Sequence, residues 1–281
     1  MSIQRVRSKL AKTEVLLQDD RLRGHIPDTQ PLSYDAVTAM LAQYGMVYIK
    51  PDLGTFGNGV MRVETIPDGY LAQLGTQVHS YTSPVQLYEG IIGLKSKGPY
   101  VVQRGIELLR HQDRRFDVRV MVQQNPEGRW ETTGIIGRLS HPRRIVTNYH
   151  SGGTPLALDT LTMDHLDEDA LPAYKKRLTA LGTAVAIQLT TKYPRLKEIG
   201  IDVALDHALH PWILEVNTLP DPFIFKRLRS KSVFRRIYRY AKAYGRFDTG
   251  RSKLTRRASA RRGTTGATRS SYRKTARHPK R

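Results

Sequence analysis

The chain has 281 residues, enough for one large domain or two small ones, and it contains no cysteine, which excludes disulfides and thiolate metal sites. Its net charge of +21 is concentrated at one end. Residues 226–281 hold 21 of the 46 lysines and arginines but one of the 25 acids, whereas residues 1–225 hold 25 basic and 24 acidic residues. The sequence therefore predicts an electrically balanced domain followed by a basic C-terminal segment.

No segment of the sequence is typical of a targeting or membrane-spanning element. The residues after Met1 are polar and basic and lack the apolar stretch of a secretory signal. No apolar run approaches the roughly 18 residues that cross a bilayer. We therefore expect a cytoplasmic protein, or one assembled onto a structure from the cytoplasmic side.

The N-terminal part of the sequence predicts two helices. The first begins at residues 12–17, and the connection after it ends at Pro27-Asp28-Thr29. Ser33 is a typical N-cap for the second helix, over Tyr34–Tyr44, whose apolar residues recur every three or four positions. Gly45 favours the left-handed conformation that ends a helix.

A short apolar strand at residues 46–49 leads into Lys50 and a glycine-rich loop, Gly54–Gly59. Glycines take positive φ, so that successive backbone N–H groups can form a nest for an anion. A lysine beside such a loop adds a charge suited to phosphate. The loop matches neither GxxxxGK[ST] nor GxGxxG. A hairpin turn with a surface lysine is therefore an alternative interpretation.

Short strands and a helix are predicted after this loop. Apolar clusters between turn signals predict strands at Val60–Val63, Gly69–Leu74, Gln77–Tyr81 and Tyr100–Gln103. A helix over Pro84–Lys95 should point four residues inward, namely Leu87, Tyr88, Ile91 and Ile92.

Residues 115–124 alternate in polarity, and after a tight turn a second strand runs over residues 130–138. Asp117 and Arg119 share one face of the first strand, and Arg138 lies on the second. Arginines on a sheet face in a nucleotide cleft usually clamp a phosphate or an acyl phosphate. The alternative is an Asp–Arg pair at the surface.

Residues 141–159 show no periodicity and predict an irregular loop on the substrate side of a site. An apolar stripe from Leu171 to Leu189 then predicts a long helix, with Pro172 near its start and Pro194 just past its end. The stripe is expected to be core.

Two apolar runs, Gly200–Leu205 and Pro211–Asn217, flank a polar turn and predict an antiparallel hairpin. Asp202, Glu215 and Asn217 interrupt these strands. Glu215 and Asn217 are two residues apart and point to one face, which Asp202 can reach from the partner strand. Two carboxylates and an amide oxygen suit Mg²⁺ held partly by nucleotide phosphates. Polar groups at solvent-facing strand ends are the alternative.

The basic C-terminal segment divides in two. Residues 226–245 have the spacing of a basic amphipathic helix, which could dock on the domain or meet an anionic surface. Residues 246–281 are expected to be disordered. Their charge favours binding to an anionic polymer, a nucleic acid or a membrane surface. A solvated extension is the alternative.

Together, the lysine before a glycine-rich loop, a hinge at Tyr100–Leu109 and the D(x)12ExN pattern ending at Asn217 resemble the ATP-grasp superfamily. Arg115–Val120, the tryptophan hairpin and Thr147–Gly153 are similar to its YheC/YheD group, which is associated with the endospore coat of Bacillus-like bacteria. The resemblance covers roughly residues 12–225.

The resemblance implies an α+β ATP-grasp fold over residues 1–225, in which two lobes with antiparallel sheets clasp the nucleotide. The lid lobe is expected at roughly 46–102 and the catalytic lobe at roughly 103–225. The implied cofactors are ATP and Mg²⁺. The implied activity is that of a ligase that activates a carboxylate as an acyl phosphate, from which an amine or a thiol displaces phosphate.

The resemblance also implies a role for individual residues. Lys50 and the glycine loop would bind the phosphates. A second lysine from the N-terminal helix would also bind them, and the sequence leaves open whether this is Lys12 or Lys9. The backbone of Gln103–Gly105 would pair with adenine, and Glu107 would bind the ribose. The implied cofactor-binding residues are Lys12, Lys50, Gly54, Thr55, Gly57, Asn58, Gly59, Gln103, Arg104, Gly105, Glu107 and Leu214. The implied metal ligands are Asp202, Glu215 and Asn217. The implied catalytic residues are Lys50, Arg119 and Arg138, of which the two arginines would stabilise charge on the transferring phosphoryl group.

The sequence departs from the family pattern in three places. Gln103 stands where many ATP-grasp ligases have glutamate, and no arginine lies near Gly200. Only 49 residues precede Lys50, so the usual N-terminal substrate domain is expected to be mostly missing. A second interpretation therefore stays open: a catalytically weak or inactive ATP-binding structural or morphogenetic protein of the spore-coat type, whose basic tail binds a polyanion.

Overall fold

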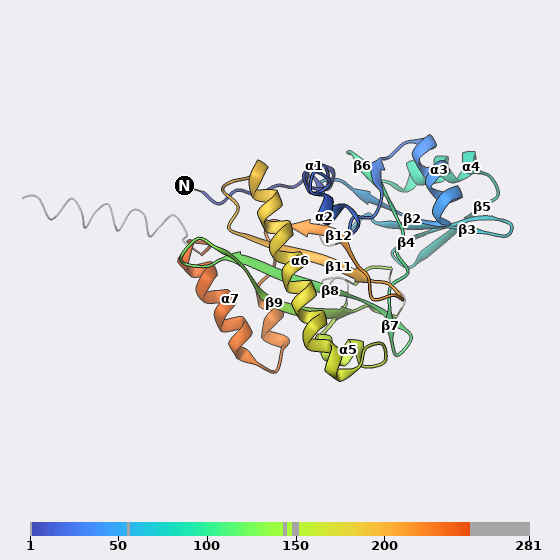
Figure 1. The fold of residues 1–281 in the computed structure, drawn as a ribbon. Coiled ribbons are helices and arrows are strands. Elements are labelled where there is room, and N and C mark those ends of the chain that lie inside the picture. The colour runs from blue at the N-terminus through green and yellow to red at the C-terminus, as the bar shows by residue number, and fades with distance from the viewer. Residues whose placement is uncertain (1, 55–56, 143–144, 148–151, 248–281) are drawn as a thin grey trace, which may run out of the picture. The chain divides into compact units, whose positions relative to one another are not determined.

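Two antiparallel β-sheets, each covered by helices, make up the part of the chain up to Tyr244 (Figure 1). The computed structural model describes residues 2–54, 57–142, 145–147 and 152–247. Residues from Gly245 onward form a second unit. The predicted disordered tail therefore lies almost wholly outside the described residues. No helix among the described residues is both long enough and apolar enough to cross a bilayer.

The first sheet has the strand order β1-β6-β2-β3-β4-β5. Its strands are β1 (Thr29–Pro31), β2 (Met46–Pro51), β3 (Met61–Ile66), β4 (Gly69–Leu74), β5 (Gln77–Tyr81) and β6 (Tyr100–Arg104). The predicted meander and the buried strand at Tyr100–Gln103 are confirmed. The sequence did not predict β1, whose three residues are too few to show a period.

Two helices cover this sheet, and their ends follow from local chemistry. In α3 (Tyr34–Tyr44) the Ser33 hydroxyl accepts a hydrogen bond from the Ala36 N–H at 3.1 Å, and Gly45 takes the left-handed conformation with φ of 70°. In α4 (Pro84–Leu94) the stripe of Leu87 and Ile91 is fully buried. The expectation that Ile92 also points inward is wrong, because one helical face meets the sheet and Ile92 lies outside it, 43% exposed.

The second sheet has the order β10-β9-β8-β11-β12, and β7 pairs with β8. Its strands are β7 (Arg110–His111), β8 (Arg114–Gln124), β9 (Trp130–Leu139), β10 (Thr154–Leu156), β11 (Glu198–Leu205) and β12 (Pro211–Asn217). Both predicted hairpins are confirmed. The expectation that residues 141–159 are irregular throughout is wrong, because β10 pairs with β9 at this sheet's edge.

The helices of this half are α1 (Lys9–Leu16), α2 (Asp20–Arg23), α5 (Leu158–Thr162), α6 (Leu171–Lys192) and α7 (Lys231–Ala243), with short 3₁₀ turns η2 (Glu168–Ala170) and η3 (Phe223–Arg227). Helix α6 crosses the second sheet and buries its predicted stripe (Figure 1). Helix α1 begins at Lys9, three residues before the predicted start, because the Ser8 hydroxyl caps it by accepting from the Ala11 N–H at 3.0 Å.

Strand β8 sends alternate side chains to two different partners. Phe116, Val118 and Val120 join the core beneath α6. On the opposite face, Met121 packs with Phe225 and Ile237, so η3 and α7 close this part of the sheet. The basic helix thus docks on the domain through its apolar stripe. The remainder of the same face carries Asp117 and Arg119.

Docking of η3 and α7 predicts unequal effects for two phenylalanines that are two residues apart. Phe225 is fully buried and Phe223 is 45% exposed. We expect Phe225→Ala to lower the free energy of unfolding by about 3–5 kcal/mol, because it leaves a cavity above the sheet. Phe223→Ala, the matched control, should cost less than about 1 kcal/mol. Urea unfolding of the full chain measures both, and equal losses would contradict this packing.

Candidate functional site

The N-terminal turn of α1 is fixed to the end of β2 by Asp52. The Asp52 carboxylate accepts from the Leu10 N–H at 2.8 Å, and its carbonyl accepts from the Lys9 N–H at 3.1 Å. Lys9 then reaches the glycine loop, where its Nζ donates to the Gly54 carbonyl at 2.9 Å. These bonds bring two segments more than 40 residues apart in sequence to one place.

The glycine loop needs glycine at several of its positions. Gly57 and Gly59 have φ of 75° and 72°, in the left-handed region that favours glycine. A Cβ on Gly54 would lie 2.8 Å from the Cβ of Pro51. Thr55, a predicted cofactor-binding residue, lies outside the described residues.

Lys50 projects from the end of β2 and is held by a side chain of the neighbouring strand. Its Nζ donates to Gln103 Oε1 at 2.5 Å, and Gln103 Nε2 donates to Thr29 Oγ1 at 2.9 Å. Burial lowers the pKa of Lys50 to about 8, against the opposing pull of Glu215. The surface-lysine interpretation is therefore wrong, because Lys50 is a half-buried cation whose hydrogen-bond partner is a neutral amide.

Two arginines and two aspartates form a buried network across three adjacent strands. Arg138 Nε and Nη2 donate to the two oxygens of Asp117 at 2.8 and 2.5 Å, and Nη2 also lies 3.0 Å from Asp202 Oδ2. Arg119 Nε donates to Asp202 Oδ1 at 2.5 Å. All four residues are at most 8% exposed, so the interpretation as a surface pair is wrong.

This network controls the charge of Asp202. Burial alone would raise the pKa of Asp202, but the charges of Arg119 and Arg138 outweigh it and leave that pKa below its ordinary value. Asp202 is therefore an anion at neutral pH. Burial likewise opposes the positive charge of Arg138, and the two aspartates reverse the effect and raise its pKa.

A β-bulge on β12 gives two successive residues the same orientation. Asp202 pairs with Glu215, whereas Val203 pairs with Ile213, so Leu214 is an extra residue in the ladder. As a result Ile213 and Val216 both enter the core, and Leu214 and Glu215 both line a cavity. Bulges commonly re-aim side chains beside functional sites.

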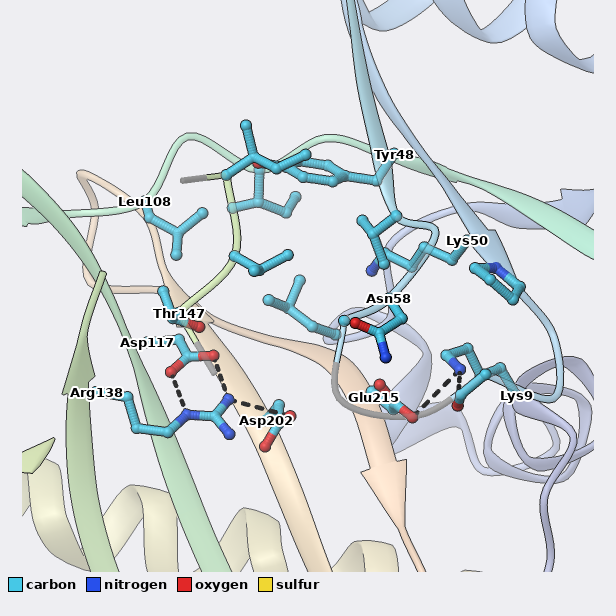
Figure 2. Close-up of a pocket in the computed structure, with 18 residues that line it drawn as sticks. Lys9, Tyr48, Lys50, Asn58, Leu108, Asp117, Arg138, Thr147, Asp202 and Glu215 are labelled. Carbon is cyan, nitrogen blue, oxygen red and sulfur yellow. Dashed lines mark hydrogen bonds and ion pairs between the residues drawn. The ribbon is translucent and has the colours of Figure 1, made fainter. Parts of the chain in front are cut away.

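The first cavity, of about 90 Å³, lies between the two sheets and combines an apolar part with charged walls. Figure 2 shows Asp117, Arg138 and Asp202 on one wall, with Lys50 and Lys9 across from them and Glu215 beside Lys9. The Lys9 Nζ lies 3.4 Å from Glu215 Oε1. The apolar lining comprises Tyr48, Val60, Ile106, Leu108, Ile145, Val146 and Leu214.

A second, larger cavity of about 450 Å³ adjoins the first. The two share four lining residues, namely Gly54, Arg138, Asp202 and Glu215. The second cavity adds Arg119 and Asn217 from the sheet and Lys12 from α1. Residues 5–7 and 218–221 complete its walls together with Leu53 and Ile224.

Most of the predicted site residues meet at these cavities. Lys50, Gly54, Gly57, Asn58 and Leu214 line the first cavity, and Lys12, Arg119 and Asn217 line the second. Asp202, Glu215 and Arg138 lie between the two. Of the two candidate lysines of α1, Lys9 lines the first cavity and Lys12 the second, and both line a third, smaller cavity together with Lys50.

The predicted adenine and ribose residues lie apart from both cavities. The N–H groups of Arg104 and Gly105 donate to the Asp28 and Met46 carbonyls, at 2.8 and 2.9 Å. Glu107 is half exposed and lies 3.3 Å from Arg62. Gly59 adjoins the cavity without lining it.

Sequence reasoning missed some residues that complete the site. The sequence places Asp117 on the same face as Arg119 but does not indicate that it lines a cavity, as it does in the structure. Ile106 and Leu108 lie within the predicted hinge and supply apolar lining. Arg5 and Arg7 carry no local signal, because their place depends on contacts with residues more than 200 positions away.

Asp202, Glu215 and Asn217 offer two carboxylates and an amide oxygen, which are the types of ligand that Mg²⁺ prefers. No cluster of three or more His, Asp or Glu residues that could hold a metal ion occurs among the described residues. Both oxygens of Asp202 already lie within ion-pair distance of arginines. Glu215 and Asn217 are therefore the freer donors.

The model of YheC/D-like ATP-grasp proteins matches residues 4–247. The chain belongs to this family. The match includes α7, in keeping with the docking of that helix on the sheet.

Two named relatives agree with this assignment. Endospore coat-associated protein YheD of Bacillus subtilis (strain 168) is 26% identical over 219 residues, covering 75% of this chain and 48% of YheD. Endospore coat-associated protein YheC of the same organism is 24% identical over 216 residues, covering 73% of this chain and 57% of YheC. The chain thus spans about half the length of these relatives.

The crystal structure of D-cycloserine synthetase DcsG superposes with a TM-score of 0.52 at 15% identity, covering 86% of this chain and 70% of DcsG. At that identity the likeness shows the fold alone, which is the ATP-grasp fold of two α+β lobes that the resemblance implied.

The buried network predicts a large, pH-dependent effect of removing its central cation. Arg138→Met leaves Asp117 and Asp202 facing one another without that charge, so we expect about 3–5 kcal/mol less stability at pH 7. Asp202 keeps Arg119 but loses the charge of Arg138, one of the two that lower its pKa, so it should take up a proton more readily on folding. The deficit relative to wild type should therefore shrink as the pH falls from 7 to 4.

Urea unfolding across this pH range measures the effect, with Arg23→Met as the control, because Arg23 is exposed and its contacts, with Asp20 and the Leu17 carbonyl, lie at the surface. A deficit below about 1 kcal/mol, or one that grows at low pH, would contradict the role given to Arg138.

Proposed function

We propose that this chain binds ATP in the first cavity and transfers the terminal phosphoryl group to a carboxylate held in the second. The observation that carries the proposal is the wall shared by the two cavities, where Arg138, Asp202 and Glu215 face both. Two reactants bound on either side of this wall would meet there. Membership of the ATP-grasp family supports nucleotide binding.

The chemical character of the first cavity suits a nucleotide. Its apolar part, with Tyr48, Ile106 and Leu214, offers flat and aliphatic surfaces for a purine ring. Lys50 and Lys9 lie beside the glycine loop and would bind the triphosphate. A phosphate would also favour the charged form of Lys50, whose pKa burial has lowered to about 8.

The reaction proposed is carboxylate activation. A carboxylate oxygen of the substrate attacks the terminal phosphorus, the bond from that phosphorus to the bridging oxygen breaks, and ADP leaves. An amine or thiol then attacks the carbonyl carbon of the acyl phosphate, the carbon–oxygen bond breaks, and inorganic phosphate and a proton leave. Arg119 and Arg138 would stabilise the negative charge that builds up on the phosphoryl oxygens.

Magnesium is the second cofactor proposed, held by Glu215 and Asn217 and, once an arginine contact loosens, by Asp202. When bound it would neutralise charge on the phosphate oxygens. Lys9, which lies 3.4 Å from Glu215, would help orient that carboxylate.

A second candidate function rests on the charge of the C-terminal segment and on the names of the relatives. Residues 226–281 carry 21 basic residues and one acid, and YheD and YheC are both endospore coat-associated. A catalytically weak ATP-binding morphogenetic protein, held to a spore-coat polyanion by this segment, would fit these facts. The charged wall between the cavities favours the ligase, since nucleotide binding alone requires no second cavity.

Calorimetry of ATP with Mg²⁺ tests the proposed nucleotide site. We expect wild type to bind ATP in a magnesium-dependent manner, and a Glu215→Ala, Asn217→Ala double variant to lose at least tenfold in affinity, about 1.4 kcal/mol. Glu127→Ala, which removes an exposed acid in the turn after β8, is the control and should bind as wild type. No ATP binding by wild type would contradict the proposal.

A further inference from the structure

The charges that line the second cavity are mostly balanced inside the protein. Arg119 pairs with Asp202, and Arg138 pairs with both Asp117 and Asp202. Arg5 Nη2 lies 2.8 Å from Glu198 Oε1. These cations therefore have protein anions beside them.

Two further cations at this cavity, Arg7 and Lys12, form no ion pair with the described residues. Among the described residues Arg7 has no ion pair, and its side chain is exposed where it lines the cavity. Lys12 is 4% exposed, and its Nζ donates to the Val6 carbonyl at 3.2 Å. Burial lowers the pKa of Lys12 to about 8 although the charge of Glu215 opposes this, so a further anion beside its ammonium would be favourable.

The backbone that carries Arg7 is anchored rather than free. Val6 N–H donates to the Thr218 hydroxyl at 2.8 Å, and that hydroxyl donates back to the Val6 carbonyl at 3.2 Å. Arg5 Nη1 donates to the Thr218 carbonyl. These bonds fix residues 5–7 beside the end of β12, because Thr218 directly follows the predicted magnesium ligand Asn217.

The rest of the cavity wall is partly aliphatic. Leu53, Leu219, Pro220 and Ile224 line it. The one acid among residues 218–221 is Asp221, whose Oδ1 accepts from the Phe223 N–H at 2.8 Å. The cavity thus offers a charged wall shared with the first cavity, aliphatic surface, and two cations that form no ion pair with the described residues.

We infer that the acid activated by this protein carries a second anionic group, which Arg7 and Lys12 recognise, joined to the reacting carboxylate by a short aliphatic chain. The inference rests on the proposed function and specifies its substrate class. Arg7 and Lys12 are specificity-determining residues in this account, because they bind the end of the substrate that does not react.

The test uses the full chain saturated with Mg²⁺ and a non-hydrolysable ATP analogue, whose binding is measured first. Calorimetry then compares α,ω-dicarboxylates from malonate to adipate with their monoamides, which have the same length and one charge fewer. At least one diacid should bind tenfold or more tightly than its monoamide. The phosphonate of matching length distinguishes a second carboxylate from a phosphate-like group as the preferred anion.

Variants assign that preference to particular residues. Arg7→Ala should remove most of the preference for the diacid while leaving monoamide and nucleotide binding within about twofold, and Arg7→Lys should retain part of it. Lys12→Met should also reduce the preference for the diacid over the monoamide. Arg23→Ala, which removes an exposed arginine outside both cavities, should change nothing.

The possible outcomes distinguish failure of the substrate inference from failure of the proposed function. Nucleotide binding with no diacid binding, or with equal binding of diacid and monoamide, overturns this inference and leaves the nucleotide proposal standing. A preference that survives in Arg7→Ala and in Lys12→Met overturns it as well. No nucleotide binding by wild type overturns the proposed function and this inference together.

Discussion

The Arg138 guanidinium, 3% exposed between Asp117 and Asp202, is the interaction on which the site depends. Burying these ions costs desolvation energy, which close pairing must offset. The three residues come from β9, β8 and β11, so the network also fixes the register of the sheet. A slip of one residue would turn each side chain to the opposite face. The ion pairs that organise the charged wall are therefore also a constraint on the fold.

The two faces of this sheet divide the tasks of stability and function. One face packs beneath α6 through a largely apolar core. The opposite face has two parts. Near Met121 it is covered by η3 and α7, and at its other end it carries the charged wall of the cavities. Gly200 belongs to this arrangement, because a Cβ there would lie 2.6 Å from Pro220 and 3.2 Å from the Arg119 side chain. The sequence lacks the arginine that many ATP-grasp ligases have near Gly200, and Arg119 from β8 extends over that position instead.

The elements predicted from the sequence are those with a local cause. Ser33 and Gly45 delimit α3 because capping depends on neighbouring residues. The D(x)12ExN hairpin follows from alternation around a polar turn, and it places Asp202 opposite Glu215 as expected. The resemblance to ATP-grasp proteins was carried by the same motifs, and the family match confirms it.

What the sequence did not reveal depends on tertiary contacts. The bulge at Leu214 has only a weak signal in the sequence. Ile213 and Val216 are both core residues although they are three positions apart, whereas strict alternation would put them on opposite faces. Lys9 and Lys12 are brought to the site by Asp52, which anchors the first turn of α1 from about 40 residues away. Residues 5–7 become part of the site through Thr218. The adenine assignment at Gln103–Gly105 came from the family resemblance and stays a prediction.

The most direct test of two reactant sites joined at one wall is a crystal structure of the chain with Mg²⁺ and a non-hydrolysable ATP analogue. The triphosphate should lie along Lys50 and the glycine loop. Its terminal phosphate should contact the wall of Arg138, Asp202 and Glu215 and face the second cavity. A nucleotide bound elsewhere, or a triphosphate directed away from that wall, would contradict it.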